Sequence, residues 1–539
     1  MDKNNSIKLY PFLSRSKNLM EYFFIIGIEE RLLEERQIPE MSLISSISSD
    51  LSLKNIDINQ IIKRIYPTKP KSIDLKSNEK KTESVIFSDC FNSEKGDKKI
   101  FYSCYALKFY EKYGEFYIPK AFAIISEYPY FTTFHKICLF LYEKVIEENK
   151  YKEDGGKIPI DIYLYCLVNF SPSPINNNIN LKVFPNDEII KIPKLTAYPF
   201  IDFDLFSILN IVPINELIKI YILVFLEIPL LFFFNNIEKL NLFIYALYIL
   251  NYPLTNTTYF WYIYSISDQD LKKGFHHAGP TLRGVNKNYS SDLDCTNFIG
   301  LEYIVDLKSK KLVLIKDNKN ENEIKTLLDI IKKKGEKSFL IDAINSLEIK
   351  LKKIENNYNI IKREKNLTSS FYMDDKIMDL NKLIQEAFYD FNINILVELY
   401  KEYQLNDSCS SIVKCKNKIN ESSEGGNIII KYLKYTDKCN IYFNNYVKNF
   451  ESIDEYRMSL FIFDDLVNKK IIDLKKQSQK MNEIRYFEII DGFYSTKKTL
   501  EIFTDTISKE DKDNIRNIEY NKGKKKSKKR ILFYLDKKK

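Results

Sequence analysis

Residues that commonly carry enzyme chemistry are scarce in this chain and are not grouped at working distances. The 539 residues include three histidines, His135, His276 and His277. His276 and His277 are neighbours, so on a helix they would point about 100° apart and could not share the i, i+4 face of a metal site. His135 falls on a predicted helix, where it could face solvent. The histidines therefore do not predict a catalytic or metal site.

Motifs that bind phosphate or activate a nucleophile are also missing from the sequence. It contains no Gly-x-Gly-x-x-Gly, no Gly-Lys-Ser/Thr and no Gly-x-Ser-x-Gly. Asp374 and Asp375 form a carboxylate pair, but they are sequence neighbours with no sign of a shared pocket. Cys409 and Cys415 lack companion ligands at the spacing of a zinc site. We therefore predict no bond-breaking chemistry, no cofactor and no metal.

The composition is that of a packed protein from a reducing compartment. Hydrophobic residues make up 45% of the chain, and 38 Tyr, 37 Phe and 1 Trp are ample for buried cores. The eight cysteines are scattered without a Cys-x-x-Cys pair, which is typical of intracellular proteins. No signal peptide is evident, since the apolar stretch at 19–28 is interrupted by Glu21. A chain of this length divides into about two to four domains.

The charge is modest and evenly spread. The net charge is +9, on 82 basic and 73 acidic residues. A nucleic-acid-binding protein would gather its basic residues on one element and interleave aromatics, so we predict no nucleic-acid partner. The exception is Lys522–Arg530, KGKKKSKKR. We interpret this run as a solvated tail, with contact to an anionic membrane and nuclear import as alternatives.

One stretch, Leu217–Phe234, is apolar enough to raise the question of a membrane span. It holds fourteen Leu, Ile, Val and Phe residues but also Lys219, Glu227 and Pro229, so its hydropathy is close to balanced. The local pattern favours a helix stopped by Pro229, followed by a strand, a cap and a second helix at Leu230–Phe234, Asn235-Asn236 and Ile237–Leu250. We therefore predict a buried α/β core here.

The first 170 residues read as an α+β domain. We predict a helix at Tyr130–Glu147, and strands at Tyr22–Ile26, Val85–Asp89, Ile100–Phe109, Ala121–Ile125 and Asp161–Val168. Val85–Asp89 and Ile100–Phe109 would form a hairpin. The Ser-rich Ser42–Ser52 and the charged Lys69–Lys81 are interpreted as loops or insertions.

The rest of the chain combines an α/β region with helices. Strands are predicted at Leu301–Asp306 and Leu312–Lys316, helical stretches within 318–370, and an amphipathic helix at Asn381–Tyr403. Asn406–Asn427, which includes Gly425-Gly426, is predicted as a polar loop. The expected boundaries are 1–170, a linker at 171–192, 193–317, a Lys/Asn-rich insertion or helices at 318–370, a helical part at 371–475 and a charged tail at 476–539.

The junction between the strand at Ala121–Ile125 and the following helix carries a recognisable set of residues, namely Pro119, Lys120, Ser126, Tyr128, Pro129 and Phe131. This set resembles the Pro-Lys-x-x-x-x-x-Ser-x-x-Pro-x-Phe segment that closes the upstream part of the tripartite DENN family. Further resemblances follow in chain order, at Leu19–Gly27, Phe87–Tyr110, Ile214–Pro253, Pro280–Val285 with its Pro280 and Gly284, Val305–Leu307 with its Asp306, Ile384–Phe391 and Phe461–Lys469.

The sequence departs from the family pattern in three places. Ile228-Pro229 stands where the family usually has basic residues, and Asn235-Asn236 stands where its cap is commonly Ser-rich. The Lys-rich stretch 318–370 is an expansion. We expect these departures to affect the choice of partner more than the fold.

The resemblance implies a fold and a function. The fold is α/β, with an N-terminal longin-like α+β lobe (upstream DENN) followed by a larger α/β lobe (central DENN) and an all-helical C-terminal part (downstream DENN). The function is guanine-nucleotide exchange on a Rab-type small GTPase in vesicle trafficking, performed without covalent chemistry by a surface that spans both lobes. The protein would be cytoplasmic, or peripheral at endomembranes.

The resemblance also suggests where the GTPase would bind. The candidates are Tyr128, Thr132, Thr133 and Lys136 at the helix start, and Asn235 and Asn236 at the central cap. Phe131 and Phe134 are expected to pack in the core. Tyr128 and Tyr130 are expected to reach the surface, because a Tyr hydroxyl needs a polar partner or water.

Two alternative functions remain open. One is an inactive interaction platform that keeps the fold without exchange activity. The other is a GTPase-activating scaffold of the folliculin type, which would need an exposed arginine in the upstream lobe. The arginines available there are Arg15, Arg31, Arg36 and Arg64.

Overall fold

The computed structural model describes part of the chain, in segments separated by gaps. The described residues are 19–28, 41–48, 57–66, 82–92, 99–113, 116–126, 130–153, 163, 164, 167, 178–180, 189–191, 201–252, 254, 260–261, 282–286, 303–314, 322–333, 338–365, 371, 373–404, 424–434, 436 and 439. They fall into two compact units. Of the described residues, one unit contains those within 14–84 and 91–195, and the other contains those within 85–90 and 196–462. We call them the antiparallel unit and the mixed unit after their sheets.

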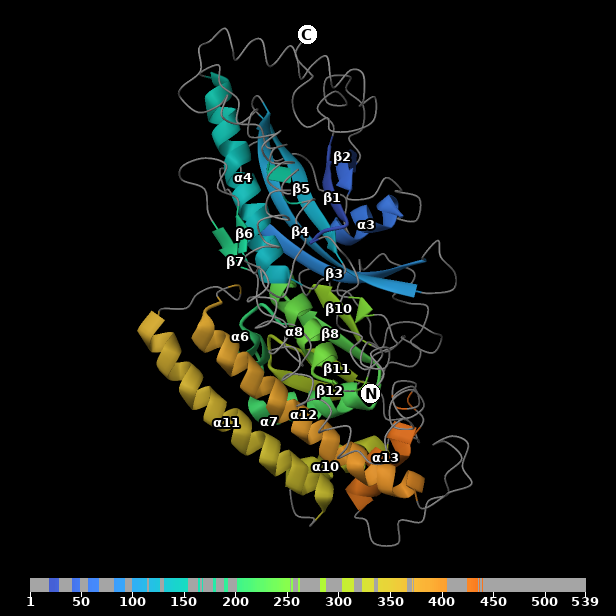
Figure 1. The fold of residues 1–539 in the computed structure, drawn as a ribbon. Coiled ribbons are helices and arrows are strands. Elements are labelled where there is room, and N and C mark those ends of the chain that lie inside the picture. Colours follow the sequence, from blue (N-terminus) through green and yellow to red (C-terminus); the bar gives the residue numbers. More distant parts are fainter. Residues whose placement is uncertain are drawn as a thin grey trace, which may run out of the picture. The chain divides into compact units, whose positions relative to one another are not determined.

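The antiparallel unit is built on a five-stranded sheet with the order β2-β1-β5-β4-β3 (Figure 1). Its strands are β1 (Tyr22–Gly27), β2 (Ser42–Ser48), β3 (Glu83–Asn92), β4 (Lys99–Tyr113) and β5 (Phe116–Ser126). Helix α4 (Phe131–Glu153) packs against β4. The predicted strand, turn and helix around Ser126 therefore exist as β5 and α4, and the predicted hairpin strands are β3 and β4.

Aromatic side chains fill the core between this sheet and α4. The Phe109 ring lies 4.7 Å from that of Phe122 and 5.1 Å from that of Tyr142 on α4, measured between centroids. Phe131 and Phe134 are fully buried, as predicted. These large rings account for much of the buried apolar area, which is the main favourable contribution to folding.

Three features of the antiparallel unit differ from the sequence predictions. Ser42–Ser48, expected to be a loop, forms edge strand β2, which pairs antiparallel with β1. Its serines are tolerated because an edge strand is only half covered. Tyr163, Leu164 and Leu167 are helical and buried where a strand was predicted, and their i, i+1, i+4 spacing fits one helical face. Helix α3 (Ile58–Ile65), capped by Asp57, was not predicted.

The predicted linker at 171–192 has some regular structure. Its described residues form a small antiparallel sheet of β6 (Asn178–Asn180) and β7 (Ile189–Lys191).

The mixed unit contains a second five-stranded sheet, with the order β12-β11-β8-β10-β9. Its strands are β8 (Leu230–Phe234), β9 (Phe260–Trp261), β10 (Leu282–Asn286), β11 (Tyr303–Asp306) and β12 (Lys311–Leu314). Strand β8 is central and pairs in parallel with both β10 and β11, while β12 turns back antiparallel to β11. Parallel strands are typically covered on both faces, which fits the continuous run of apolar residues in β8.

The apolar stretch 217–234 folds as a helix followed by a strand, as predicted. Helix α7 (Ile214–Phe225) ends at its cap Leu226, and β8 begins at Leu230. Glu227 has a φ of 57°, and the Ile228 N–H donates to the Leu223 carbonyl at 3.0 Å. This is a Schellman end with Glu in the place usually taken by Gly, so the helix stops before Pro229. Among the described residues, no helix combines the length and the apolarity that crossing a bilayer needs.

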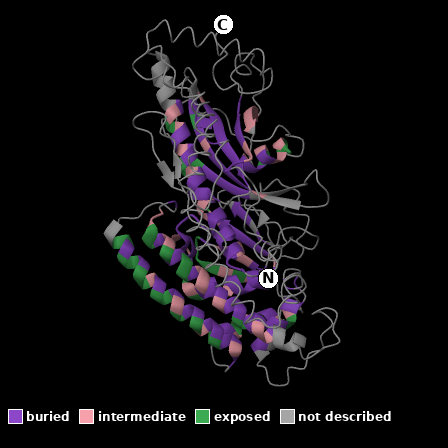
Figure 2. Ribbon diagram, in the orientation of Figure 1, coloured by how far each residue is buried: buried purple, intermediate pink, exposed green. Residues whose placement is uncertain are grey.

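Helices surround the sheet of the mixed unit. They are α6 (Leu205–Leu209), α7, α8 (Ile237–Ile249), α10 (Asn322–Lys333), α11 (Phe339–Lys365), α12 (Asp375–Gln404) and α13 (Glu424–Lys434). The predicted helical stretches within 318–370 are α10 and α11. The apolar face predicted for Asn381–Tyr403 is buried at Ile384, Phe388, Phe391, Ile395 and Leu399. Figure 2 shows buried residues concentrated in the sheet layer and exposed ones along α11.

The glycine pair at 425–426 lies in the first turn of α13 and not in the predicted loop. A Cβ on Gly425 would come within 3.2 Å of Ile330 Cγ2 on α10. A side chain here would need Ile330 to move by a few tenths of an ångström, so the close contact between α10 and α13 favours glycine at this position. The predicted helices near 444–450 and 458–468 lie outside the described residues.

Candidate functional site

The carboxyl edge of the parallel strands is the best-defined candidate site in the mixed unit. Asn235 and Asn236 follow β8 directly, and Asp306 is the last residue of β11. Because β8 and β11 are parallel and Asp306 pairs with Phe233, these residues lie at the same edge of the sheet. Ligands of open α/β sheets bind outside the carboxyl ends of their strands. Parallel pairing thus brings the predicted binding pair Asn235-Asn236 to the same edge as Asp306, which the sequence indicated only as a structural residue of the family motif.

Local hydrogen bonds fix the backbone at this edge. The Asn236 side chain accepts from the Lys239 N–H at 2.9 Å and caps α8, as predicted. Asp306 Oδ1 accepts from the N–H of Lys308 at 3.0 Å and that of Ser309 at 3.3 Å. Asn236 and Asp306 therefore hold two turns in place, and Asn235 is the exposed amide beside them.

The turn after Asp306 adds a group of positive charges to the edge. Lys308, Lys310 and Lys311 are all exposed, and Lys310 has a φ of 58° in the tight hairpin between β11 and β12. We call these three residues the basic hairpin. No sequence pattern distinguishes these lysines, because lysine is abundant throughout the chain. Their clustering depends on the hairpin geometry.

Gly284 lies on the same sheet and has a structural role. It is buried in β10, where it pairs with Phe232 of β8. Pro280 lies outside the described residues.

In the antiparallel unit, the family-motif residues before the turn are buried. The Ser126 hydroxyl donates to the Leu19 carbonyl at 2.7 Å and is fully buried. Lys120 is 2% exposed, and its ammonium forms an ion pair with the buried carboxylate of Glu111. Pro119 is also buried. These contacts join β5 to β4 and to the chain before β1, so the motif stabilises the sheet.

The predicted partner-binding residues at the start of α4 divide into two groups. Lys136 is exposed and could contact a partner. Thr132 and Thr133 are 3% and 1% exposed, because the first turn of α4 packs into the interior. Tyr130, expected at the surface, is only 2% exposed, since its ring packs beside Phe134. Tyr128 and Pro129 lie outside the described residues.

His135 belongs to a polar cluster that the sequence did not reveal. Its Nδ1 lies 2.6 Å from the Tyr105 hydroxyl, which is 2.9 Å from the Ser84 hydroxyl. Burial, with a smaller contribution from Lys136, lowers the His135 pKa from 6.5 to about 4. The imidazole is therefore neutral near pH 7. Three residues from different elements meet only in the fold, so no sequence spacing could have indicated them.

Arg64 does not fit the role of an activating arginine. It is 8% exposed on α3, whereas a residue that reaches into a partner's nucleotide site must project from the surface. Arg15, Arg31 and Arg36 lie outside the described residues.

Side chains that could bind a metal ion are not clustered in the described segments. Within the segments given above, no cluster of three or more His, Cys, Asp or Glu side chains could hold a metal. Asp374, one of the paired carboxylates, caps α12 by accepting from the Ile377 N–H at 2.9 Å.

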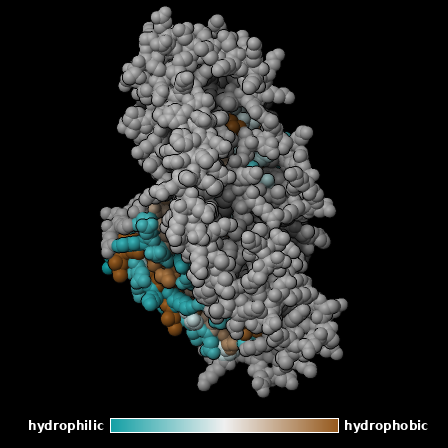
Figure 3. All heavy atoms as spheres, in the orientation of Figure 1, coloured by the Kyte–Doolittle hydropathy of each residue, from teal (hydrophilic) through white to brown (hydrophobic). Residues whose placement is uncertain are grey.

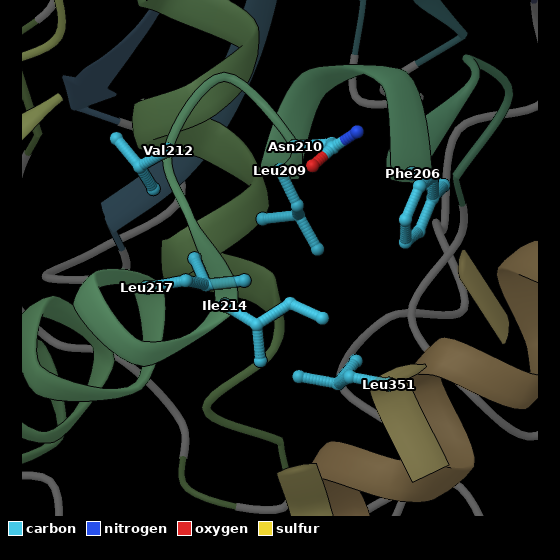
Figure 4. Close-up of a pocket in the computed structure, with 7 residues that line it drawn as sticks. All are labelled: Phe206, Leu209, Asn210, Val212, Ile214, Leu217 and Leu351. Carbon is cyan, nitrogen blue, oxygen red and sulfur yellow. The ribbon is translucent and has the colours of Figure 1, made fainter. Parts of the chain in front are cut away.

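A small hollow among α6, α7 and α11 has an almost wholly apolar lining (Figure 4). Its lining residues are Phe206, Leu209, Asn210, Val212, Ile214, Leu217 and Leu351. With Asn210 as the one polar residue in its lining, it has little with which to orient a polar ligand. The surface at the carboxyl edge therefore remains the stronger candidate.

Comparisons with known proteins identify one family. The model of the DENN (AEX-3) domain matches residues 117–298. This stretch includes β5, α4, the parallel strands β8 and β10, and the Asn235-Asn236 edge. Comparison with curated proteins gives no significant match.

Proposed function

From the premise that residues 117–298 carry a DENN domain, we propose that this protein is a guanine-nucleotide exchange factor for a Rab-type small GTPase. DENN domains are in general regulators that interact with small GTPases and do not break bonds. One observation carries the proposal: the stretch that matches the DENN domain contains Asn235 and Asn236, at the carboxyl edge after β8. The exposed amide and three lysines at this edge can bind a partner but cannot by themselves perform covalent catalysis.

Nucleotide exchange requires only differential binding. A protein that binds the nucleotide-free GTPase more tightly than the loaded one weakens nucleotide binding by the same factor. A thousandfold faster release needs about 4 kcal/mol of stabilisation of the transition state. A standard interface of about 800 Å² per partner is large enough to provide it. The absence of catalytic motifs from the sequence is therefore compatible with this function.

We propose three exposed contacts from the sequence candidates together with the basic hairpin. Asn235 and Asn236 would contact the GTPase in the mixed unit, with the hairpin lysines guiding an acidic partner to the edge. Lys136 would contact it in the antiparallel unit. Thr132 and Thr133 would act indirectly, by fixing the first turn of α4 beneath Lys136.

The same proposal assigns the parts of the chain. The antiparallel unit would be the longin-like upstream lobe, residues 193–317 the central lobe, and α12 with α13 the start of the helical downstream part. The protein would act at the cytoplasmic face of endomembranes, where Rab-type GTPases control vesicle traffic.

Release of mant-GDP from a panel of purified Rab-family GTPases tests the proposal. We expect the full chain to accelerate release from one or two members. The variant Lys308→Gln/Lys310→Gln/Lys311→Gln should slow that release about tenfold, because steering by charge mainly sets association rates. The control Lys352→Gln/Lys353→Gln/Arg363→Gln removes the same charge from α11 and should leave exchange unchanged.

An inactive platform is the second candidate, favoured by the residues just before β8. Ile228 and Pro229 are uncharged, and Ile228 is only 8% exposed. This position therefore lacks the exposed positive charge that the family usually has here. A panel on which neither GDP release nor GTP hydrolysis changes would reject exchange and support the platform. Faster GTP hydrolysis would reject both the exchange factor and the inactive platform. The activating arginine would then be sought among Arg15, Arg31 and Arg36.

A further inference from the structure

The outward face of α11 carries the two most exposed large hydrophobic side chains of the described residues. Ile349 is 68% and Ile360 56% exposed, the two highest values among large hydrophobic residues of the described segments. They are eleven residues apart, so they lie on the same side of the helix, about 16 Å from one another. Leu383 of the neighbouring α12 is a further exposed residue, at 44%.

Positive charges accompany these isoleucines along the same side of the helix. The exposed residues on this side between 349 and 363 are Ile349, Lys352, Lys353, Asn356, Ile360 and Arg363. We call them the α11 stripe. It contains three cations and no carboxylate. Figure 3 shows the surface over α11 and α12 as largely hydrophilic with hydrophobic patches within it.

Nearby carboxylates offset only part of this charge. Glu348, beside the stripe, is buried and pairs with Lys352 at 2.7 Å. Glu355 is half-buried on the flank. On α12, exposed Asp375 and Asp379 lie near Lys376, and Lys382 is 4.0 Å from Glu386. On α11 itself, exposed Asp342 lies on the same side, seven residues before Ile349. The surplus of positive charge therefore comes from Lys353 and Arg363.

The rest of α11 already has its partners. The opposite face packs against α12 and α7, and the Tyr358 hydroxyl donates to Asp204 Oδ2 at 2.8 Å. A helix anchored in this way presents its outer side as a rigid row about 20 Å long, from residue 349 to residue 363. Ile349 and Ile360 lie on this outer side and remain largely exposed.

We propose that the α11 stripe binds the surface of an anionic phospholipid membrane. Lysine is depleted at protein–protein interfaces, where aromatic and Met side chains are enriched, and the stripe has two lysines, no aromatic residue and no Met. Lysine and arginine beside aliphatic side chains are what binds anionic headgroups, because the charges meet the phosphates while the aliphatic groups enter the acyl boundary. This site is separate from the Lys522–Arg530 tail and does not depend on the proposed exchange activity.

Co-sedimentation of the full chain with vesicles tests the proposal. We expect binding to vesicles of phosphatidylcholine and phosphatidylserine, and much weaker binding to phosphatidylcholine alone. Lys352→Gln/Lys353→Gln/Arg363→Gln should weaken binding at least about 20-fold, at about fivefold per unpaired charge near the surface. Ile349→Ser/Ile360→Ser should weaken it about tenfold, because two aliphatic side chains no longer enter the membrane.

The basic-hairpin variant Lys308→Gln/Lys310→Gln/Lys311→Gln provides the matched control. It removes the same charge elsewhere in the mixed unit and should bind vesicles like the unaltered chain. An equal loss in both charge variants would overturn the proposal, because binding would then follow net charge. Unchanged binding in both α11 variants would overturn it too, and would assign the membrane contact to another segment. Loss of a protein partner on substitution, without vesicle binding, would show an ordinary protein interface.

A second readout separates insertion from misfolding. Ile349→Trp should show a blue-shifted emission and quenching by brominated lipid on addition of the anionic vesicles, with Trp261 as the common background. All variants should keep the unaltered far-ultraviolet circular dichroism, since the substituted side chains are exposed. Absence of quenching would exclude contact of Ile349 with the bilayer.

Discussion

The buried ion pair of the antiparallel unit joins two neighbouring strands, whereas two buried asparagines of the mixed unit join helix α12 to segments far away in the chain. Lys120 and Glu111 are on paired strands, nine residues apart. In the mixed unit, Asn392 on α12 donates to the carbonyls of Leu250 and Tyr252 at 2.9 and 2.8 Å, about 140 residues away in the chain. The strands that carry Lys120 and Glu111 are already paired through their backbones. The hydrogen bonds of Asn392, by contrast, attach α12 to the rest of the mixed unit.

Asn381 and Tyr358 extend the second arrangement. The Asn381 amide donates to the Phe203 carbonyl at 2.7 Å and accepts from the Leu205 N–H at 3.1 Å. Tyr358 on α11 donates to Asp204, and burial raises the pKa of that carboxyl despite hydrogen bonds that favour its ionised form. Two helices are thus tied to the segment that begins α6. We infer that polar substitutions should have local effects in the antiparallel unit and should release helices in the mixed unit.

The largest effect is expected from breaking the buried ion pair. Glu111→Ala leaves the Lys120 ammonium without its carboxylate and should cost about 4 kcal/mol of unfolding free energy. Hydrogen exchange by mass spectrometry should show the loss in peptides from β1, β4 and β5, with α11 and α12 unaffected. Glu83→Gln, which removes a partly exposed partner of Lys108, is the control and should cost less than about 1 kcal/mol. Equal losses would show that burial does not govern the effect.

Asn392→Leu tests the attachment of α12. It should cost about 3 kcal/mol, because three buried hydrogen bonds of Asn392 are lost. The Tyr252 carbonyl loses the Asn392 amide, whereas the Leu250 carbonyl and the Tyr221 hydroxyl keep their hydrogen bond to each other at 2.8 Å. Exchange should increase along α12 and α11 and remain unchanged in β4 and β5. Asn394→Ala, an exposed position on the same helix, should change stability by less than about 0.5 kcal/mol. Protection lost in the antiparallel unit would contradict the comparison.

The next effect is a dependence of stability on pH in the antiparallel unit. The His135 pKa is lowered from 6.5 to about 4, so between these values the unfolded chain binds more protons than the folded one. Stability is therefore present above pH 6.5 and is lost as the pH falls toward 4, by about 2 kcal/mol at about pH 5. Urea unfolding at several pH values measures this slope, and His135→Gln should flatten it. An unchanged slope in the variant would assign the dependence to other groups.

The smallest effect is expected at the edge of the mixed unit. Asn236→Ala removes the cap of α8 and should cost about 1 kcal/mol. The faster exchange should be confined to the first turn of α8, since the helix is otherwise buried. Asn236→Asp should retain the cap and serves as the matched variant. A similar loss in both variants would show that the side-chain oxygen is not what stabilises the helix.

Much of the fold could be predicted where local pattern and tertiary demand agree. The sequence Leu230–Phe234 followed by Asn235-Asn236 indicated a buried strand and a cap, because an apolar run bounded by turn residues has few other uses. The spacing of Ile384, Phe388 and Phe391 likewise indicated the buried face of α12. The predictions were wrong where the secondary structure of a segment depends on the element packed against it. Ser42–Ser48 forms a strand by pairing with β1, and Gly425 lies in the first turn of α13, close to the Ile330 side chain of α10.

The candidate site shows the same division. The sequence indicated Asn235, Asn236 and Asp306 individually, through the resemblance to a family, but not that they share an edge. The sequence likewise predicted that Thr132, Thr133 and Lys136 would all contact the partner. A helix with one face against a sheet, however, buries the residues on that face. Which of these residues are buried depends on which face of α4 meets the sheet. The spacing of hydrophobic residues in the first turn of α4 does not determine that face.

The sequence by itself determined the strand and helix on either side of Ser126, the helix, strand and helix between residues 214 and 250, the absence of familiar catalytic motifs, and the cap that begins α8. These features depend on residues within a few positions of one another, where backbone geometry and side-chain type suffice. The tertiary structure alone decided which polar residues are buried in pairs, that the His135 imidazole stays neutral, and that α11 exposes two isoleucines beside lysines. Those properties depend on desolvation by segments far away in the chain, which no local pattern records.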